Sequence, residues 1–351
     1  MAYTTINKSS DYFNTKLYTG NGGTQSITGV GFQPDWVWIK NTADTDWHFL
    51  TDAVRGVTKT IHSNTNNAES TQASALTAFG TDGFSVGNDT AVNANSENIV
   101  AWNWKANGAG SSNTAGSINS TVSVSATSGF SIVKYTGTGA NASIGHGLGV
   151  APKVVLIKSL SASEDWSVYF LDTSVAYNNV NNYLELNTSN ASAGDSGARF
   201  GVYSNFTTST FGVGNDNATN ASGSTYIAYC FRDVQGYSKF GSYVGNGDAD
   251  GSFIYTGFKP AFVIFKRTDS AVSWSMVDNK RDTYNPTNKR LFPDLSNTEN
   301  TSLDPFIDLV SNGFKLKASS TAFNGSGNSY IYIAFAEAPL VGTNNVPATA
   351  R

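Results

Sequence analysis

Apolar residues alternate with polar residues in short runs along most of the chain, and clusters of Gly, Asn, Asp and Ser separate the runs. TYIAYCFR at 225–232 and GFKLK at 313–317 are typical runs, and GNGG, GNDN and NGSGNS are typical separators. Alternation with a period of two indicates strands, and the separating residues favour turns. Helical periodicity is rare, with LDPFIDLVSNG at 303–313 as its best example. The pattern therefore predicts an all-β protein of short antiparallel strands.

Three segments share an unusual order of residues: Gly, then Pro, then a run of Val, Ile and aromatic residues that ends in Lys. They are GFQPDWVWIK at 31–40, GLGVAPKVVLIK at 147–158 and GFKPAFVIFK at 257–266. Pro lacks an amide donor and fixes φ, so it suits the start of a strand. We expect each segment to be a central core strand, with the Lys where the strand reaches the surface. A row of Lys side chains that binds a ligand is the alternative.

Other markers recur in the same order around these segments. The recurring Pro residues are Pro34, Pro152 and Pro260, the Trp residues are Trp47, Trp166 and Trp274, and the Asp residues are Asp52, Asp172 and Asp278. Ordered markers in three copies are strong evidence for tandem duplication. We expect the recurring Pro and Trp residues to be structural parts of a repeated core.

Each repeat is long enough to bury a core, so we expect three tandem antiparallel β-sandwich domains of the jelly-roll or lectin-like kind. The expected divisions are an N-terminal arm at 1–12, sandwiches at 13–108, 129–235 and 236–340, a linker at 109–128 and a tail at 341–351. The linker is expected because this segment is rich in Gly, Ser, Asn and Thr and almost uncharged. The tail is expected to be extended or disordered.

Composition narrows the possible partners. Charged residues make up 14% of the 351 residues and the net charge is −4, so nucleic-acid binding has little electrostatic support. No apolar run approaches the ~20 residues of a membrane span, and MAYTTINKSS lacks the pattern of a secretory signal. The single cysteine, Cys230, excludes an intrachain disulfide, and its alternating apolar run indicates a small core residue.

Residues that could carry catalysis do not form a constellation in the sequence. The three histidines are His48, His62 and His146. They lack metal-ligand spacing, and neither a nucleophile elbow nor a phosphate-binding Gly loop is present. The recurring Asp residues are expected at strand ends rather than in a catalytic pair. We therefore expect no catalytic residue, no cofactor and no enzymatic activity.

Two acid pairs, Asp44/Asp46 and Asp248/Asp250, are expected in loops without a bound metal. The alternative is a calcium site in DADG at 248–251, formed by loop oxygens. Aromatic residues outside the recurring positions are candidates for ligand contact, because such rings stack on sugars while Asn and Asp bind hydroxyls. These candidates are Trp38, Tyr177, Tyr183 and Tyr284.

The first repeat resembles a known family. The residues that carry the resemblance are DYFNTKLYTGNGGTQSITGVGFQPDWVWIKN at 11–41, DAVRGVTK at 52–59 and NIVAWNWKANG at 98–108. They are similar to repeat domains in virion-associated proteins of marine tailed phages, which occur in tail fibres and structural proteins. The second repeat has GVAPKVVLIK in place of FQPDWVWIK, and the third lacks the VRGVTK piece. The resemblance implies a lectin-like β-sandwich in a phage particle and contributes no catalytic residues.

The leading hypothesis is a virion structural protein, namely a tail fibre, spike or capsid-surface appendage that contacts the host surface or its glycans. Its expected partners are other virion proteins, further copies of the chain with a trimer favoured, and a host glycan, without nucleic acid or membrane insertion. The chain would be made in the host cytoplasm and released by lysis. The first alternative is a secreted, non-catalytic array of lectin-like modules. The second is a glycan-degrading enzyme, for which no convincing carboxylate pair is present.

Overall fold

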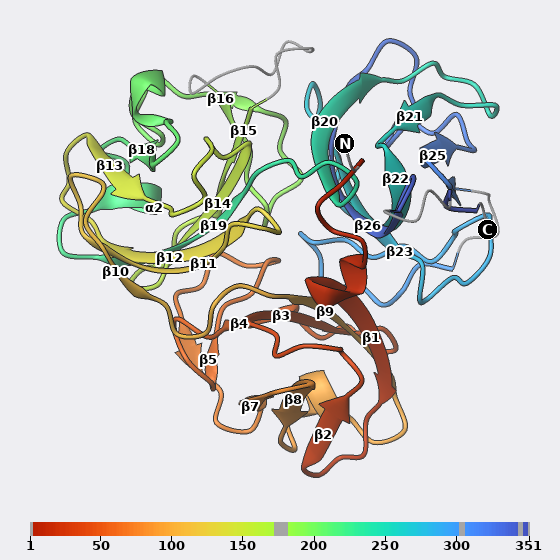
Figure 1. The fold of residues 1–351 in the computed structure, drawn as a ribbon, viewed down its shortest axis with the longest axis horizontal. Helices are drawn as coiled ribbons and strands as arrows, with labels where there is room; N and C mark the ends of the chain where they lie inside the picture. The colour runs from red at the N-terminus through yellow and green to blue at the C-terminus, as the bar shows by residue number, and fades with distance from the viewer. Residues whose placement is uncertain (1–2, 172–181, 302–305, 343–346, 350–351) are drawn as a thin grey trace.

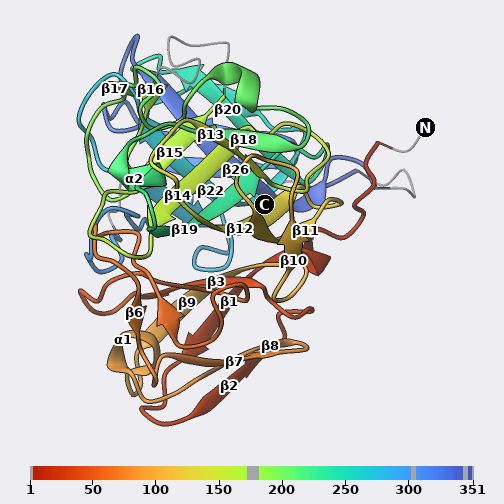
Figure 2. The same cartoon turned by 90° about the vertical axis from the view of Figure 1, so that its left-hand side faces the viewer.

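Three similar pairs of antiparallel β-sheets make up the chain, one pair for each sequence repeat (Figures 1 and 2). The computed structural model describes residues 3–171, 182–301, 306–342 and 347–349. In these residues strands dominate and helices are single turns, which confirms the predicted all-β class. We call the pairs unit 1, unit 2 and unit 3; in Figure 1 they surround a common centre with the smaller sheets outermost.

Unit 1 begins after a short 3-10 helix, η1 (Ser9–Asp11). Its larger sheet has the order β1 (Phe13–Thr19), β9 (Asn98–Trp104), β3 (Trp36–Asn41) and β4 (Phe49–Asp52). Its smaller sheet has the order β2 (Gln25–Thr28), β8 (Gly83–Val86) and β7 (Leu76–Gly80), and β5 (Lys59–Thr60) pairs with β6 (Ser70–Thr71). Asp89 caps the single-turn helix α1 (Thr90–Asn93) by accepting a hydrogen bond from Ala91 N.

Unit 2 repeats this plan with extra strands at one edge. Its larger sheet has the order β10 (Ser111–Asn113), β11 (Ser120–Ser125), β12 (Phe130–Thr136), β19 (Thr225–Phe231), β14 (Val154–Ser159) and β15 (Ser167–Phe170). The remaining elements are β13 (Ala142–Gly145) paired with β18 (Thr210–Val213), β16 (Asn182–Tyr183) paired with β17 (Ala193–Gly194), η2 (Tyr203–Asn205) and α2 (Asn217–Asn220).

Unit 3 has the same two-sheet plan as unit 1. The larger sheet has the order β20 (Ser238–Val244), β26 (Ser329–Pro339), β22 (Phe258–Arg267) and β23 (Ser275–Asp278). The smaller sheet has the order β21 (Phe253–Tyr255), β25 (Gly313–Leu316) and β24 (Ile307–Val310). The helical periodicity at 303–313 was misleading, because 307–310 is a strand and 303–305 lie outside the described residues.

Strand pairing places the three repeats in register. Where the central strand first pairs with the edge strand, the facing residues are Trp36 with Asp52, Val154 with Phe170, and Phe262 with Asp278. The recurring Pro residues therefore share one position two residues earlier, and all three are buried. The same register aligns Trp166 and Trp274 with His48. Trp47 comes one residue earlier and is 45% exposed, so its assignment to the repeated core is wrong.

Each larger sheet is buried on both faces. One face packs on the smaller sheet of its own unit, which gives three separate apolar clusters. The other face points to the centre of the molecule, where apolar residues of all three units form one shared cluster. Burial on both faces explains why the central strands are continuous apolar runs rather than alternating ones.

Aromatic rings from different units stack in the shared cluster. The Trp36 ring of unit 1 lies 4.3 Å from the Tyr229 ring of unit 2, between centroids, and the stacking is parallel. Phe231 of unit 2 lies 5.7 Å from Phe335 of unit 3, which in turn lies 5.2 Å from Phe13 of unit 1. Aromatic side chains bury more apolar area than any others, so the three units are joined by a common core and are not strung out along the chain.

Three segments that were expected outside the sandwiches make defined contacts. In the expected linker, β10 and β11 extend the larger sheet of unit 2, with β11 pairing along its whole length with β12. In STVSVS, Val122 is buried and Val124 is partly buried, and both pack in the apolar cluster of unit 2. In the expected N-terminal arm, Ile6 is 2% exposed in the shared cluster and Tyr3 Oη donates to Gly257 O at 2.7 Å. In the expected tail, Val341 forms a β-bridge with Pro347.

Candidate functional site

A ring of three equivalent hydrogen bonds joins the units. The residue directly before β4, β15 or β23 provides the side chain in each case. Its ring nitrogen donates a hydrogen bond to a backbone carbonyl of the neighbouring unit. The bonds are His48 Nε2 to Phe292 O at 3.0 Å, Trp166 Nε1 to His62 O at 2.9 Å and Trp274 Nε1 to Glu185 O at 2.9 Å. The acceptors are equivalent too, because each directly follows the bridged residue Ile61, Leu184 or Leu291. Units 1, 2 and 3 thus form a closed cycle.

His48 replaces a Trp in this ring, and its hydrogen bonds fix its tautomer. The indole Nε1 of Trp38 donates to His48 Nδ1 at 2.8 Å. Nδ1 is therefore an acceptor, so Nε2 carries the proton and donates to the Phe292 carbonyl. Burial lowers the pKa of His48 well below its usual value, and the charge of Lys40 lowers it further. The imidazole is therefore held neutral in the orientation that completes the ring.

The acceptors lie on three hairpin segments, residues 59–71, 182–194 and 289–301, which we call arms. Each arm also donates one backbone hydrogen bond to the unit on which it lies. These bonds are Glu69 N to Leu160 O at 3.1 Å, Ser192 N to Thr268 O at 2.8 Å and Glu299 N to Thr42 O at 2.9 Å. A head-to-tail contact that closes after three copies is the geometry of a cyclic trimer. Here one chain supplies all three copies.

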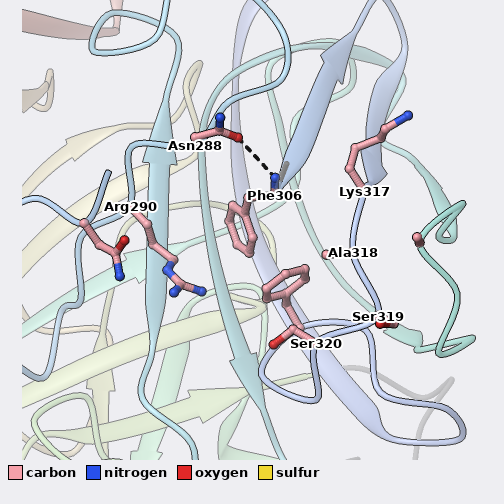
Figure 3. Close-up of a pocket in the computed structure, with 10 residues that line it drawn as sticks. Asn288, Arg290, Phe306, Lys317, Ala318, Ser319 and Ser320 are labelled. Atoms are coloured by element: carbon pink, nitrogen blue, oxygen red, sulfur yellow. Dashed lines mark hydrogen bonds between the residues drawn. The ribbon is translucent and has the colours of Figure 1, made fainter. Parts of the chain in front are cut away.

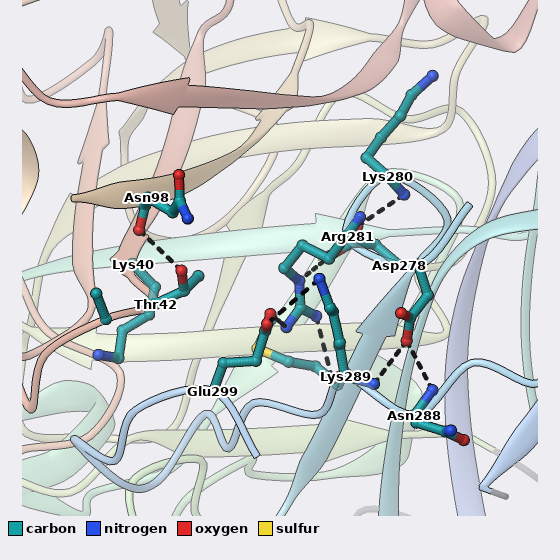
Figure 4. Close-up of polar contacts among 12 residues, drawn as sticks. Lys40, Thr42, Asn98, Asp278, Lys280, Arg281, Asn288, Lys289 and Glu299 are labelled. Atoms are coloured by element: carbon teal, nitrogen blue, oxygen red, sulfur yellow. Dashed lines mark hydrogen bonds and ion pairs between the residues drawn. The ribbon is translucent and has the colours of Figure 1, made fainter. Parts of the chain in front are cut away.

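Buried ion pairs reinforce two of the three contacts. In unit 3, Arg281 pairs with Asp278 at 2.6 Å and with Glu299 of the arm at 2.9 Å (Figure 4). Trp102 of unit 1 donates to Asp278 at 3.2 Å. In unit 1, Arg55 pairs with Asp52 and Glu69, and Tyr229 of unit 2 donates to Asp52 at 2.8 Å. Asp52 and Asp278 end their strands as predicted, and their carboxylates are committed to these contacts.

Unit 2 lacks this ion pair at equivalent positions. Phe170 stands where the other units have Asp, and Ser192 stands where they have Glu. The residue of unit 3 equivalent to Trp102 and Tyr229 is Ile333, which has no polar group. Where one side of a contact between units has Asp, the other side has a Trp or Tyr donor. Where one side has Phe170, the other side has the apolar Ile333. Asp172, which the sequence aligned with the other Asp residues, lies outside the described residues.

The Lys one residue before the end of each central strand is buried, contrary to the expectation that it reaches the surface. Lys40, Lys158 and Lys266 are at most 1% exposed. Burial lowers the pKa of each to about 8. Their ammonium groups donate to backbone carbonyls, among them Asn66 O and Ser189 O on the neighbouring arms. Lys158 and Lys266 therefore contribute to arm attachment, and Lys40 donates to Asn41 O and Asp44 O within its own unit. The three buried ammonium groups do not form an exposed ligand-binding row.

A pocket of about 480 Å³ opens beside the arm of unit 3 (Figure 3). Its walls come from the arm, from Phe306 and from the segment after β25. The lining residues are Ala249, Asn288, Arg290, Asn300, Phe306, Lys317, Ala318, Ser319, Ser320 and Phe323. Phe306 and Phe323 are core residues, and their rings meet edge to face at 4.1 Å. The pocket thus combines a rigid aromatic wall with hydroxyl, amide and cationic groups.

The predicted ligand-contacting residues that the structure describes have different surroundings. Trp38 is 1% exposed and bonded to His48, so its assignment as a ligand contact is wrong. Tyr183 lies half-buried beneath Arg199, whose guanidinium is 3.9 Å from the ring centroid. Tyr284 is 79% exposed. Tyr177 lies outside the described residues.

The candidate metal and nucleophilic residues are engaged in other contacts. Asp44, Asp46 and Glu97 lie close enough together to hold a cation, but Asn41 donates to both Asp46 and Glu97. In the DADG loop, Asp250 pairs with Lys315, and Asp248 accepts from the Asp250 amide. Cys230 is fully buried, and burial raises the pKa of its thiol, as expected for a small core residue. The three histidines are buried as well.

Sequence reasoning missed Arg290 and the arms. Arg290 has Thr60 and Tyr183 at the equivalent positions of the other arms, so no repeated marker pointed to it. The ion pairs had a visible signal, because an Arg follows both Asp52 and Asp278 at the third position. Among the described residues, no helix has the length and apolar character needed to cross a membrane.

Comparison with known proteins places the whole three-unit body in one family. No curated protein matches the chain. A family model described as a domain of unknown function, DUF7483, matches residues 8–339. The matched segment starts just before η1 and ends with β26, so it includes all three units and the contacts that close the ring. The chain therefore belongs to the DUF7483 family.

Proposed function

We propose that this protein is a structural component of a bacteriophage particle: a tail fibre, spike or capsid-surface appendage without catalytic activity. The observation that carries the proposal is the closed ring of units around a shared aromatic core. Such a body is held by packing, buried hydrogen bonds and ion pairs. Architecture of this kind suits a rigid building block that must persist outside a cell without disulfides.

The ring also supports a role in surface presentation. Each unit carries its smaller sheet and its turns on the outside of the molecule (Figure 1). One chain therefore presents three related sets of loops in a fixed geometry, and a homotrimer, which we propose as the assembly, would present nine. Linked weak sites gain avidity when the geometry permits simultaneous contact. The resemblance of 11–41 to phage repeat domains supports the same setting, in which the protein binds other virion proteins and reaches the host surface.

A lectin-like role outside a particle is the second candidate. The pocket of unit 3 favours it, because aromatic, hydroxyl and amide groups converge there. Both candidates predict sugar contact, but only the first predicts that the protein is found on particles.

Particle labelling tests the proposal. Virions purified from an infected culture would be labelled with an antibody to this protein and viewed by negative-stain microscopy. We expect label at a fixed place on the tail or the capsid, and sedimentation of the protein with the particles. Recovery of the protein only in the particle-free fraction would refute the proposal and leave the free lectin.

The N-terminal arm expected at 1–12 contributes to the fold and is not a free docking segment. Ile6 belongs to the shared core and Thr4 Oγ1 donates to Gln235 O at 2.6 Å. Deletion of 1–12 would therefore damage the fold itself, so a docking surface for the particle is better sought among the exposed loops.

A further inference from the structure

Arg290 lacks an acidic partner among the described residues. Its guanidinium lies over three phenyl rings, with the carbon at its centre 5.0 Å from the Phe292 ring centroid, 5.1 Å from that of Phe306 and 6.0 Å from that of Phe323. In the part of the chain that the structure describes, no carboxylate forms an ion pair with it. Figure 3 shows the guanidinium directed toward Phe306, at the wall of the pocket. Burial lowers the pKa of Arg290, because desolvation disfavours the charged guanidinium.

Unit 2 shows what a balanced version of this site looks like. Tyr183 occupies the position equivalent to Arg290, and Arg199 stacks on it. Arg199 is paired there with Glu185 at 3.0 Å. The residue of unit 3 equivalent to Glu185 is Phe292. Unit 3 thus keeps a stacked guanidinium but has a phenyl ring in place of the carboxylate.

An anion in the pocket would supply the negative charge that no described carboxylate provides to Arg290. A guanidinium offers a planar fork of donors that matches a carboxylate or a sulfate. The phenyl rings hold the fork in place, which reduces the entropy lost on binding. Lys317, which pairs with Asp308 at 3.6 Å, adds a second cation to the lining.

The remaining lining groups favour a sugar as the carrier of the anion. Ser319, Ser320 and Asn288 place hydroxyl and amide groups around the aromatic wall, and such groups suit sugar hydroxyls. The volume of about 480 Å³ lies within the usual range for small-ligand sites, roughly 300–1,000 Å³. We propose that the unit 3 pocket binds an acidic sugar, with its carboxylate or sulfate group on Arg290. The proposal deepens the glycan contact of the proposed function and rests on it.

Titration of the full chain with small probes tests the proposal. Glucuronate and glucose 6-sulfate distinguish the two anionic groups, and glucose and inorganic sulfate separate the sugar from the charge. Binding would be followed by calorimetry at low salt. We expect at least one acidic sugar to bind about tenfold or more tightly than glucose and than sulfate alone, since a hydrogen bond to a charged group has about this effect on an equilibrium.

Three variants complete the test. Arg290→Gln should weaken acidic-sugar binding by about tenfold or more, and Arg290→Lys should recover only part of it because the fork is lost. Lys59→Gln, which removes the same charge from the arm of unit 1, should leave binding unchanged. Retained melting temperature would show that each variant is folded.

Three results would overturn the inference: no binding of either acidic sugar, binding that survives Arg290→Gln, or equal binding of sulfate and the sugar acids. None of them bears on particle labelling, so failure of the pocket assignment and failure of the proposed virion role are distinguishable.

Discussion

The imidazole of His48 in unit 1 donates from Nε2 to the carbonyl of Phe292 in unit 3, at 3.0 Å. This bond joins the first part of the chain to the last and closes a ring whose other two members use Trp. The same imidazole accepts a hydrogen bond from Trp38 at Nδ1. Protonation of Nδ1 would therefore replace this hydrogen bond with a repulsive contact between two N–H donors. The ring is therefore sensitive to pH at one of its three positions.

Acidification should weaken the fold below about pH 6.5. Burial lowers the pKa of His48, His62 and His146, the last to about 4. The unfolded chain takes up protons at its usual His pKa of about 6.5, before the folded protein does, so stability is full above that pH and is lost as pH falls toward 4. Denaturant unfolding at closely spaced pH values checks this. Each His adds at most about 1.4 kcal/mol per pH unit.

His146→Gln provides the control for this titration, since its site lies away from the ring. It should remove the contribution of one His to the slope and leave the rest. An unfolding free energy that stays constant between pH 6.5 and 5 would contradict the neutral, buried state of all three histidines.

Mild alkali should stabilise the fold, whereas acid weakens it. The pKa of Lys40, Lys158 and Lys266 is lowered to about 8 by burial, whereas an unfolded Lys titrates near 10.4. From about pH 8 upward the folded state releases protons first, so the free energy of unfolding should rise with pH. Cys230, whose pKa is raised by burial, opposes this above about pH 8.5, and the measurement is best confined to pH 7.5–9. Lys158→Met should flatten the rise; an unchanged slope would contradict the buried charge.

Breaking one buried ion pair should cost more than removing it whole. Asp52→Leu leaves Arg55 buried against Glu69 alone, at a cost of about 3–5 kcal/mol in the free energy of unfolding. Asp52→Leu/Arg55→Met resembles the apolar contact of Phe170 in unit 2 and should recover part of the loss. A double variant less stable than the single one, measured by urea unfolding, would show that the pair stabilises the contact beyond its own desolvation.

The sequence predicted the strands and the repeat but not how the repeats meet. Alternating runs and turn clusters specify local structure, and the buried Pro34, Pro152 and Pro260 keep one position in all units. The shared core escaped prediction because a continuous run such as VWIK shows that a strand is buried on both faces without showing what covers the second face. Trp47 was wrongly aligned with Trp166 and Trp274, although it lies one residue closer to the Lys of its central strand than they do. Only strand pairing reveals that His48 fills their place.

Loss of a ring Trp should destabilise the whole protein rather than one unit. Trp166 is fully buried and donates to His62 O in unit 1, so Trp166→Ala removes core packing and leaves a buried carbonyl without its donor. The expected cost is about 3–5 kcal/mol. Because the units share one core, calorimetry should show a single transition that moves to lower temperature. Trp47→Ala is the matched control; with its side chain 45% exposed, it should cost less than about 1 kcal/mol, in the range of surface substitutions. A separate low-temperature transition for unit 2, with units 1 and 3 melting as before, would show that the units fold independently and that the shared aromatic core does not couple them.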